Sequence, residues 1–222
     1  MPNQSLDDVL VQAARLQRIV PDAVLVGGAA AAYHARHRVS FDHDHVIADL
    51  AERFETILEN LEALGDWSLA RAQAGKIILG SLGDIQTGVR QLIRARPLET
   101  EEVEVRGHRL VVPTAEEMLR VKCWLALTRN QTRDYLDIAA LADRIGRDRA
   151  AEVIRDIDPY YEDLHAGPEA VSTQVVRQLS DPRPRDSRTT NELHSYKQHE
   201  ARWQDWNHVV SELSGLAEAV TA

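Results

Sequence analysis

Asp42 and Asp44 are the residues whose type and spacing most directly suggest chemistry. They lie in the run Asp-His-Asp-His-Val-Ile, which predicts a β-strand, and residues i and i+2 of a strand point to the same face. Two carboxylates side by side repel each other unless a cation lies between them. Mg²⁺ favours such an oxygen site, particularly when it also carries substrate phosphates. The pair therefore predicts a metal-binding face.

Gly27 and Gly28 precede this strand. Apolar residues from Val24 to Val26 come before the glycines, and an alanine-rich segment follows them. The pattern predicts a strand, a glycine turn, a short helix and a second strand. Glycines let the backbone approach a ligand closely, and amide N–H groups at a helix start bind phosphate oxygens well. The glycines and the carboxylates together favour a phosphate-bearing ligand.

The order of these two motifs resembles the first motif of the nucleotidyltransferase superfamily. More narrowly, it is similar to the AbiEii/AbiGii-type (MenT-like) nucleotidyltransferases, many of them toxins of bacterial toxin–antitoxin pairs. A later region is similar to further motifs of the same family. It consists of Lys122, several apolar residues, and then Arg-x-x-x-Arg-Asp-x-x-Asp ending at Asp137. The resemblance extends from Val24 to about Leu141.

This resemblance implies an α+β fold: a nucleotidyltransferase-like mixed sheet with flanking helices, followed by an α-helical C-terminal region. It also implies attack of a hydroxyl group on the α-phosphorus of a nucleoside triphosphate (NTP), with release of pyrophosphate. The acceptor would be an RNA, for example the 3′ end of a tRNA, or another hydroxyl compound. The toxin role implies a cognate antitoxin as a partner.

The resemblance also assigns roles to residues. Asp42 and Asp44 would hold one or two Mg²⁺ ions, with Mn²⁺ as the alternative metal, and would be catalytic. Lys122 would neutralise phosphate charge, and Asp137 or Asp134 would orient this lysine or take part in proton transfer. The nucleotide-binding set would comprise Gly27, Gly28, Lys122, Arg133 and Asp134.

The residues of the later region also have simpler interpretations. Lys122 lies among apolar residues of a helix predicted to start at the capping box of Thr114 and Glu117, so its stem could follow the core while its charge reaches solvent. Asp134 and Asp137 share a helix face near a helix N-terminus, where acids interact favourably with the helix dipole. An ion pair with Arg133 is a further alternative.

The third carboxylate typical of the superfamily is missing. The strand that should supply it runs from Asp84 to Leu92 and offers Arg90 or Gln91 at the expected position, with Asp84 at the wrong end. The frequent serine or threonine after the glycines is replaced by Ala29. The missing third carboxylate favours one alternative, a non-catalytic binding or regulatory module with this fold. The acidic net charge favours another, a small-molecule nucleotidyltransferase.

Histidines crowd the Asp-x-Asp segment. On a strand, His43 should face away from Asp42, toward the core. The alternative is a His/Asp transition-metal site of an HD-type phosphohydrolase, which requires the His-Asp pair on a helix. A cysteine hydrolase finds no support because Cys123, the single cysteine, lies in an apolar helical setting.

The composition indicates an ordinary globular protein. The 222 residues are 44% hydrophobic and 27% charged, as in ordinary globular proteins, and no apolar run approaches the ~20 residues of a membrane span. We therefore expect a cytoplasmic protein without a membrane partner. The net charge of −9 weighs against nucleic-acid binding unless a local basic patch exists. Candidates for such a patch are Arg90, Arg94, Arg96, Arg120, Lys122, Arg129 and Arg133.

The pattern along the chain predicts three parts: an α/β head over residues 1–113, a helical region completing the active site over 114–180, and a linker with a C-terminal helix over 181–222. The head should begin with a helix capped by Ser5, include a helix ending at Gly65, and end with a hairpin turning at Arg106-Gly107. Residues 181–188 should form the linker because they contain two prolines and no hydrophobic residue. The last helix carries an apolar stripe, expected to pack on other helices, with a partner surface as the alternative.

Overall fold

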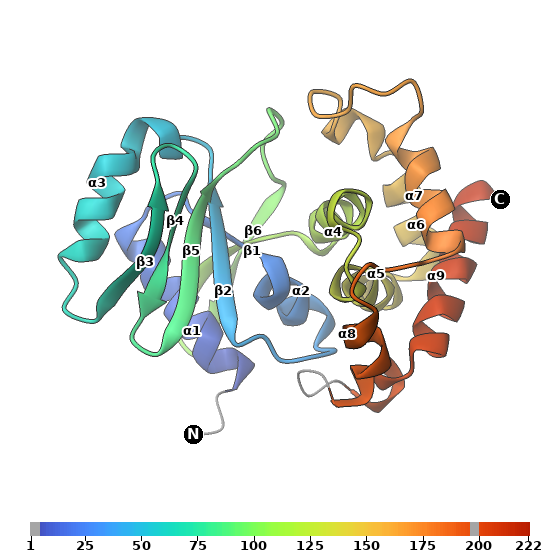
Figure 1. Ribbon diagram of the computed structural model, residues 1–222, viewed down its shortest axis with the longest axis horizontal. Coiled ribbons are helices and arrows are strands. Elements are labelled where there is room, and N and C mark those ends of the chain that lie inside the picture. Colours follow the sequence, from blue (N-terminus) through green and yellow to red (C-terminus); the bar gives the residue numbers. More distant parts are fainter. Residues whose placement is uncertain (1–4, 196–199) are drawn as a thin grey trace. The chain divides into compact units, whose positions relative to one another are not determined.

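The chain divides into two units in the computed structural model, which describes residues 5–195 and 200–222 (Figure 1). The first unit runs up to Tyr33 and resumes from Ser40 to Thr114. The second comprises His34–Val39 and the chain from Ala115 onward. The three-part division at residues 113 and 180 stays a prediction, and the structure adds that segment 34–39 belongs with the helical unit.

A five-stranded mixed sheet forms the centre of the first unit, in the order β1-β2-β5-β4-β3. Its two central strands, β2 and β5, run parallel, and the other neighbouring strands run antiparallel. A parallel pair requires a crossover, which α3, β3 and β4 supply. The strands are β1 (Val24–Val26), β2 (Asp42–Ile47), β3 (Trp67–Gln73), β4 (Ile77–Leu82) and β5 (Ile85–Gln91).

Helices α1 (Leu6–Ile19) and α3 (Leu50–Glu62) share a hydrophobic core with the sheet. Ser5 caps α1, as predicted, and the structure adds that it forms a capping box with Asp8. The predicted cap at Gly65 is wrong, because α3 ends at Glu62 and its C-cap is Ala63, whose backbone N–H donates to the carbonyl of Glu59. The shared core holds Leu16, Val20, Ala23, Ile47, Leu50, Phe54, Ile57, Leu61, Ile78, Leu82 and Val89.

Strands β6 (Thr100–Val105) and β7 (His108–Pro113) form a separate two-stranded sheet. The predicted turn is confirmed: Arg106 and Gly107 have φ angles of 49° and 79°, as a tight hairpin turn requires. The side-chain amide of Gln17 hydrogen-bonds to the backbone of Val111 as a neighbouring strand would. It donates to the Val111 carbonyl and accepts from the Val111 N–H, both at 2.8 Å. This pair ties the hairpin to α1.

The second unit is helical. Helix α4 packs against α5, and α6, α7 and α9 pack around this pair (Figure 1). The α-helices are α4 (Ala115–Arg129), α5 (Thr132–Ile145), α6 (Arg147–Arg155), α7 (Val171–Ser180), α8 (Ser187–Asn191) and α9 (Trp206–Thr221). Short 3-10 turns lie at Asp158–Tyr160, Leu193–Ser195 and Ala201–Gln204. The predicted fold class, a mixed sheet with flanking helices followed by a helical C-terminal region, is confirmed.

The apolar stripe of α9 is a packing surface, as predicted. Val209, Leu213 and Leu216 are buried, as is Trp203 just before the helix. The C-terminal helix predicted within residues 181–222 is α9, which begins at Trp206, and residues 196–199 of that range lie outside the described part of the chain. Among the described helices, none combines the length and the hydrophobicity that a membrane crossing needs.

Segment 181–186 is attached to the helical unit rather than being a free linker. Asn130 donates its side-chain N–H to the carbonyl of Arg183 at 2.9 Å, and the N–H of Arg185 donates to the carbonyl of Asn130 at 2.8 Å. Asp186 accepts from the N–H of Thr132 at 2.7 Å, at the first residue of α5. The polar, proline-containing composition of this segment predicts a linker, but its backbone and the Asp186 side chain bind Asn130 and Thr132 at the turn between α4 and α5.

Candidate functional site

Asp42 and Asp44 share one face of β2, as predicted, and lie on the side away from the helix-covered core. Burial alternates along the strand, so the two carboxylates are partly exposed while His43 and His45 are buried. The hydroxyl of the buried Ser40 donates to Asp42 Oδ1 at 2.8 Å. Asp44 keeps 37% of its side chain exposed. These are carboxylates within reach of a ligand.

Two glycines flank Asp44: Gly88 on the neighbouring strand β5, and Gly27 directly after the neighbouring strand β1. Asp44 pairs with Val26 of β1 and with Gly88 of β5. Gly27, with a φ of 75°, begins α2 (Gly27–Ala35), and a Cβ there would lie 3.6 Å from Asp44 Oδ2. A Cβ on Gly88 would lie 3.2 Å from Asp44 Oδ1 and 2.5 Å from Leu79. The first turn of α2, including Gly28, therefore starts beside this carboxylate, where phosphate oxygens can meet backbone N–H groups.

Arg90 lies where a third carboxylate was expected. The parallel register places Gln86, Gly88 and Arg90 of β5 beside Asp42, Asp44 and Val46 of β2. Arg90 Nε is 3.7 Å from Asp44 Oδ1.

The other two candidates for that position lie elsewhere. The Gln91 side chain accepts from the N–H of Ala51, the second residue of α3, and Asp84 lies in the exposed turn before β5. The face thus carries two acids and one arginine.

A divalent metal fits this donor set when the substrate supplies the remaining oxygens. Mg²⁺ is commonly held by one or two carboxylates together with substrate phosphates and water. Within residues 5–195 and 200–222, no group of three or more His, Cys, Asp or Glu side chains is arranged to hold a metal ion. The pair therefore suits a metal that arrives with a nucleotide.

The buried histidines behind the carboxylates do not suit the HD-type phosphohydrolase alternative. The Thr87 hydroxyl and His43 Nδ1 form a hydrogen bond of 2.9 Å on the core side of the sheet. Burial lowers the pKa of His43 to about 4, despite the opposing charge of Asp42, and lowers the pKa of His45 well below its usual value. His43 and Asp44 point to opposite faces of a strand, so they cannot ligate one metal together.

Lys122 of α4 is buried in the second unit, so its expected route to solvent is wrong. Only 1% of the residue is exposed. Its Nζ lies 2.7 Å from Asp137 Oδ2 and 3.5 Å from Asp134 Oδ1, both on α5. A buried ammonium is tolerated only with such partners. The predicted lysine and the two predicted acids do come together.

Asp137 is the centre of this cluster and binds two further side chains that the sequence analysis missed. Arg38 donates Nε and Nη2 to its two oxygens at 2.8 and 3.1 Å, and His37 donates Nε2–H to Oδ1 at 2.7 Å. Burial would raise the pKa of Asp137, but the charges of Arg38 and Lys122 hold it well below its usual range. Burial lowers the pKa of His37. The sequence separates these partners by about a hundred positions, and no local pattern connects them.

Asp134 pairs with Arg129 rather than with Arg133. Arg129 Nη2 donates to Asp134 Oδ1 at 2.8 Å. Asp134 lies in the first turn of α5, where an acid interacts favourably with the helix dipole, and both Asp134 and Asp137 are fully buried. Arg133 is half-buried on the same helix, and its role in nucleotide binding stays a prediction.

The predicted basic patch is wrong as a surface feature, because several of its members are buried. Arg94 donates to the carbonyls of Arg96 and Pro97 at 2.9 and 3.0 Å. Arg120 pairs with Glu117 at 2.9 Å and lies 4.0 Å from the centre of the Tyr160 ring. With Lys122 also buried, these cations act within the fold.

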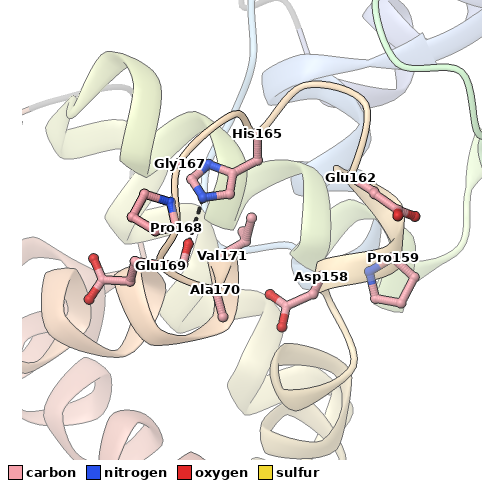
Figure 2. Close-up of a pocket in the computed structure, with 9 residues that line it drawn as sticks. All are labelled: Asp158, Pro159, Glu162, His165, Gly167, Pro168, Glu169, Ala170 and Val171. Carbon is pink, nitrogen blue, oxygen red and sulfur yellow. Dashed lines mark hydrogen bonds between the residues drawn. The ribbon is translucent and has the colours of Figure 1, made fainter.

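A cavity of about 470 Å³ opens in the second unit, formed by residues 158–171 (Figure 2). Asp158 accepts from the N–H of Ser172 at 2.8 Å and so caps the first turn of α7. His165 and the carbonyl of Glu169 are 2.6 Å apart across the loop (Figure 2). The cavity contains none of the predicted site residues.

Comparison with curated proteins relates the chain to a part of larger transport proteins. It is 30% identical over 197 residues to the heme uptake protein MmpL11 of Mycobacterium tuberculosis, covering 83% of the chain and 20% of that protein. It is 39% identical over 113 residues to the probable transport protein MmpL11 of Mycobacterium leprae, covering 50% of the chain and 11% of that protein. The chain thus spans at most about a fifth of the length of these relatives. No protein-family model matches the chain.

Comparison with solved structures identifies the fold. The solution structure of the antibiotic-resistance factor ANT(2″)-Ia aligns with a TM-score of 0.51 and 14% identity, covering 70% of this chain and 92% of that one. A nucleotidyltransferase-like protein from Paracoccidioides brasiliensis aligns with a TM-score of 0.48 and 16% identity, covering 73% of this chain and 89% of that one. At such low identity, the shared property is the architecture. The chain has a nucleotidyltransferase-like fold.

Proposed function

We propose that this protein is a metal-dependent nucleotidyltransferase that transfers a nucleoside monophosphate from an NTP to a hydroxyl acceptor. The observation that carries the proposal is the face of β2, where Asp42 and Asp44 lie side by side next to the glycine that begins α2. Two exposed carboxylates and a helix start are what a metal–triphosphate complex requires. The nucleotidyltransferase-like fold supports the same conclusion.

In the proposed reaction, the acceptor hydroxyl oxygen bonds to the α-phosphorus as the bond to the bridging oxygen breaks. Pyrophosphate leaves with the bonding electrons, and the hydroxyl proton passes to solvent. Asp42 and Asp44 would hold Mg²⁺ or Mn²⁺, and Gly27, Gly28 and the following amides would hold the triphosphate. The chemistry that a bound divalent metal supplies is neutralisation of phosphate charge. Catalysis of this kind rests mostly on positioning and charge.

The residues of the second unit enter the proposal only through the family resemblance, which assigns Lys122 to the phosphates and Arg133 and Asp134 to the nucleotide-binding set. The burial of Lys122 and Asp134 and their ion pair with each other weigh against direct contact with a nucleotide. The contacts of Asp137 favour holding Lys122 over accepting a proton, because its carboxylate binds three cationic or N–H-donating side chains and its pKa lies well below the usual range. A carboxylate with so low a pKa is a weak base at neutral pH.

The acceptor and the biological role are proposed from the resemblance to AbiEii/AbiGii-type enzymes: an RNA acceptor, such as the 3′ end of a tRNA, and a toxin with a cognate antitoxin. The net charge of −9 and the burial of Arg94, Arg120 and Lys122 favour a small hydroxyl compound instead. An acceptor screen must therefore include both classes.

A second candidate is a nucleotide-binding module without turnover. The ion pair between Arg90 and Asp44 favours it, because an arginine stands where the superfamily often carries a metal ligand. In that case the nucleotide would act as a regulatory ligand.

The test is transfer of label from each α-³²P-labelled NTP, with Mg²⁺ or Mn²⁺, to total RNA and to a panel of small hydroxyl compounds. We expect a labelled product with wild type and none with Asp42→Asn. Calorimetry with the same NTPs separates the two candidates. Binding without transfer supports the regulatory module, and absence of both binding and transfer contradicts both proposals.

A further inference from the structure

We propose that Arg90 is the second cation of this site: it takes the place of a second metal ion and binds a phosphate oxygen of the nucleotide. This inference rests on the proposed function, because it needs a metal–nucleotide complex on β2. It predicts a site that holds one divalent ion. Arg90 forms and breaks no covalent bond and acts through its charge and its N–H groups.

The strand register places the guanidinium on the required face. Gln86, Gly88 and Arg90 alternate along β5 on the same side as Asp42 and Asp44 of the parallel neighbour β2. Arg90 lies beside Val46, one side-chain position beyond Asp44, and reaches back to it, with Nε 3.7 Å from Oδ1. An acid in this position would complete a three-carboxylate site, and the arginine reverses its charge.

The charge balance favours one metal. Two carboxylates carry two negative charges, which one divalent ion neutralises. A second divalent ion bound at Asp44 would be repelled by the positive charge of Arg90, whose Nε lies 3.7 Å from Oδ1 of that carboxylate. The guanidinium supplies one of the two positive charges that a second divalent ion would bring to the phosphates.

The contact between Arg90 and Asp44 is loose enough to be exchanged for a phosphate. At 3.7 Å it is longer than a hydrogen bond, and 46% of the Arg90 side chain is exposed. Gly88, between them on β5, places no side chain over Asp44. A guanidinium binds phosphate through two parallel N–H donors, which makes phosphate a better partner than a carboxylate held at this distance.

Metal stoichiometry tests the proposal directly. Mn²⁺ binding is followed by electron paramagnetic resonance in the presence of a non-hydrolysable NTP analogue. We expect one tightly bound Mn²⁺ per chain in wild type and two in Arg90→Asp, which restores a third carboxylate. Arg90→Ala should keep one Mn²⁺ but bind the Mn²⁺–analogue complex about 10- to 100-fold more weakly, as loss of a charge-assisted phosphate contact predicts. Arg90→Lys should recover part of this affinity.

Arg71→Ala is the matched control. Arg71 is an exposed arginine of β3, aligned through Leu79 with Gly88 on the same side of the sheet, and we expect it to change neither stoichiometry nor affinity. Two Mn²⁺ ions in wild type, or one in Arg90→Asp, would overturn the role of Arg90 while leaving nucleotide transfer intact. One Mn²⁺ with the expected Arg90 effects but no transfer would contradict catalysis alone. Absence of Mn²⁺ and nucleotide binding would contradict both.

Discussion

Two pairs of aspartates, Asp42/Asp44 and Asp134/Asp137, look alike in the sequence but lie in opposite environments. The first pair lies on a partly exposed strand face, where Arg90 is 3.7 Å from Asp44. The second pair is fully buried. The polarity and spacing of two aspartates in a sequence therefore do not show whether they form a ligand-binding face or a buried ion-pair network.

The difference lies in how completely each pair is neutralised. Lys122, Arg38 and Arg129 all contact the buried pair within 3.5 Å, and His37 adds a hydrogen bond. Charges removed from water must be matched in this way, or the fold loses several kcal/mol. The exposed pair keeps part of its hydration and can exchange it for a metal. We therefore expect substitutions in the buried pair to change stability and substitutions in the exposed pair to change ligand binding.

Asp137→Ala should have the largest effect. It leaves Arg38, Lys122 and His37 without their shared acceptor in a buried site, and breaking such a network costs about 3–5 kcal/mol. Urea denaturation of the purified protein measures the loss. Asp42→Ala, in the exposed pair, should change the free energy of unfolding by less than about 1 kcal/mol. Equal losses in the two variants would remove the distinction between the pairs.

Asp44→Asn should have the next largest effect, on nucleotide transfer instead of stability. The carboxamide keeps the volume but removes the charge that binds the metal, and loss of one group that stabilises transition-state charge typically lowers kcat by about 10²- to 10³-fold. The labelled-NTP assay measures it, with circular dichroism as the check on folding. Gln86→Ala, on the same face of β5, is the control that should keep activity. A fully active Asp44→Asn would contradict the proposed metal site.

Much of the first unit could be predicted from the sequence because its signals are local. Strand alternation places Asp42 and Asp44 on one face with His43 on the other, and the capping box of Ser5 and the hairpin turn at Gly107 each depend on a few neighbouring residues. Local sterics and hydrogen bonds decide such features without reference to the rest of the fold.

The second site could be predicted only in part, because its contacts are long-range. The motif from Lys122 to Asp137 identifies the lysine and the acids, but Arg38 and His37, which share Asp137 with the lysine, are about a hundred positions away and no local pattern places them there. The basic patch failed for the same reason: a sequence lists arginines without showing that Arg94 and Arg120 are satisfied inside the fold. The composition shows how many charged residues there are, but only the tertiary structure shows which groups they pair with.

Histidine protonation should produce a smaller, pH-dependent loss of stability. His43 is buried, and its pKa falls from 6.5 to about 4, while burial also lowers the pKa values of His37 and His45. A group whose pKa is depressed by folding contributes stability above its unfolded pKa and loses it as pH falls. Between pH 6.5 and 4 this histidine is protonated in the unfolded chain but neutral in the folded protein. His43 alone should therefore lower the free energy of unfolding by ~3 kcal/mol across this range, at about 1.4 kcal/mol per proton and pH unit.

The measurement is the free energy of unfolding at several pH values across this window, for wild type and His43→Leu. Removing one of the three buried histidines should lower the slope of the free energy of unfolding against pH by the equivalent of about one proton per molecule. This holds whatever the variant does to stability at neutral pH. Unchanged slopes would mean that His43 does not stay neutral in the folded protein. Asp137, whose pKa folding holds well below the usual range, contributes equally to the slopes of both proteins, so the difference between the two slopes isolates His43.

The smallest effect should come from Asp186, in the segment that the sequence predicts as a linker. Its Oδ1 accepts from the N–H and the hydroxyl of Thr132, at 2.7 and 2.8 Å, and so caps the helix that carries Asp134 and Asp137. Asp186→Ala should cost about 1 kcal/mol in urea denaturation, as loss of a helix cap usually does. Asp181→Ala is the matched control: its ion pair with Arg183 is mostly exposed, so it should cost less than about 0.5 kcal/mol. If the two variants lose equally little, the segment behaves as a free linker and the buried pair depends on α4 and α5 without this remote support.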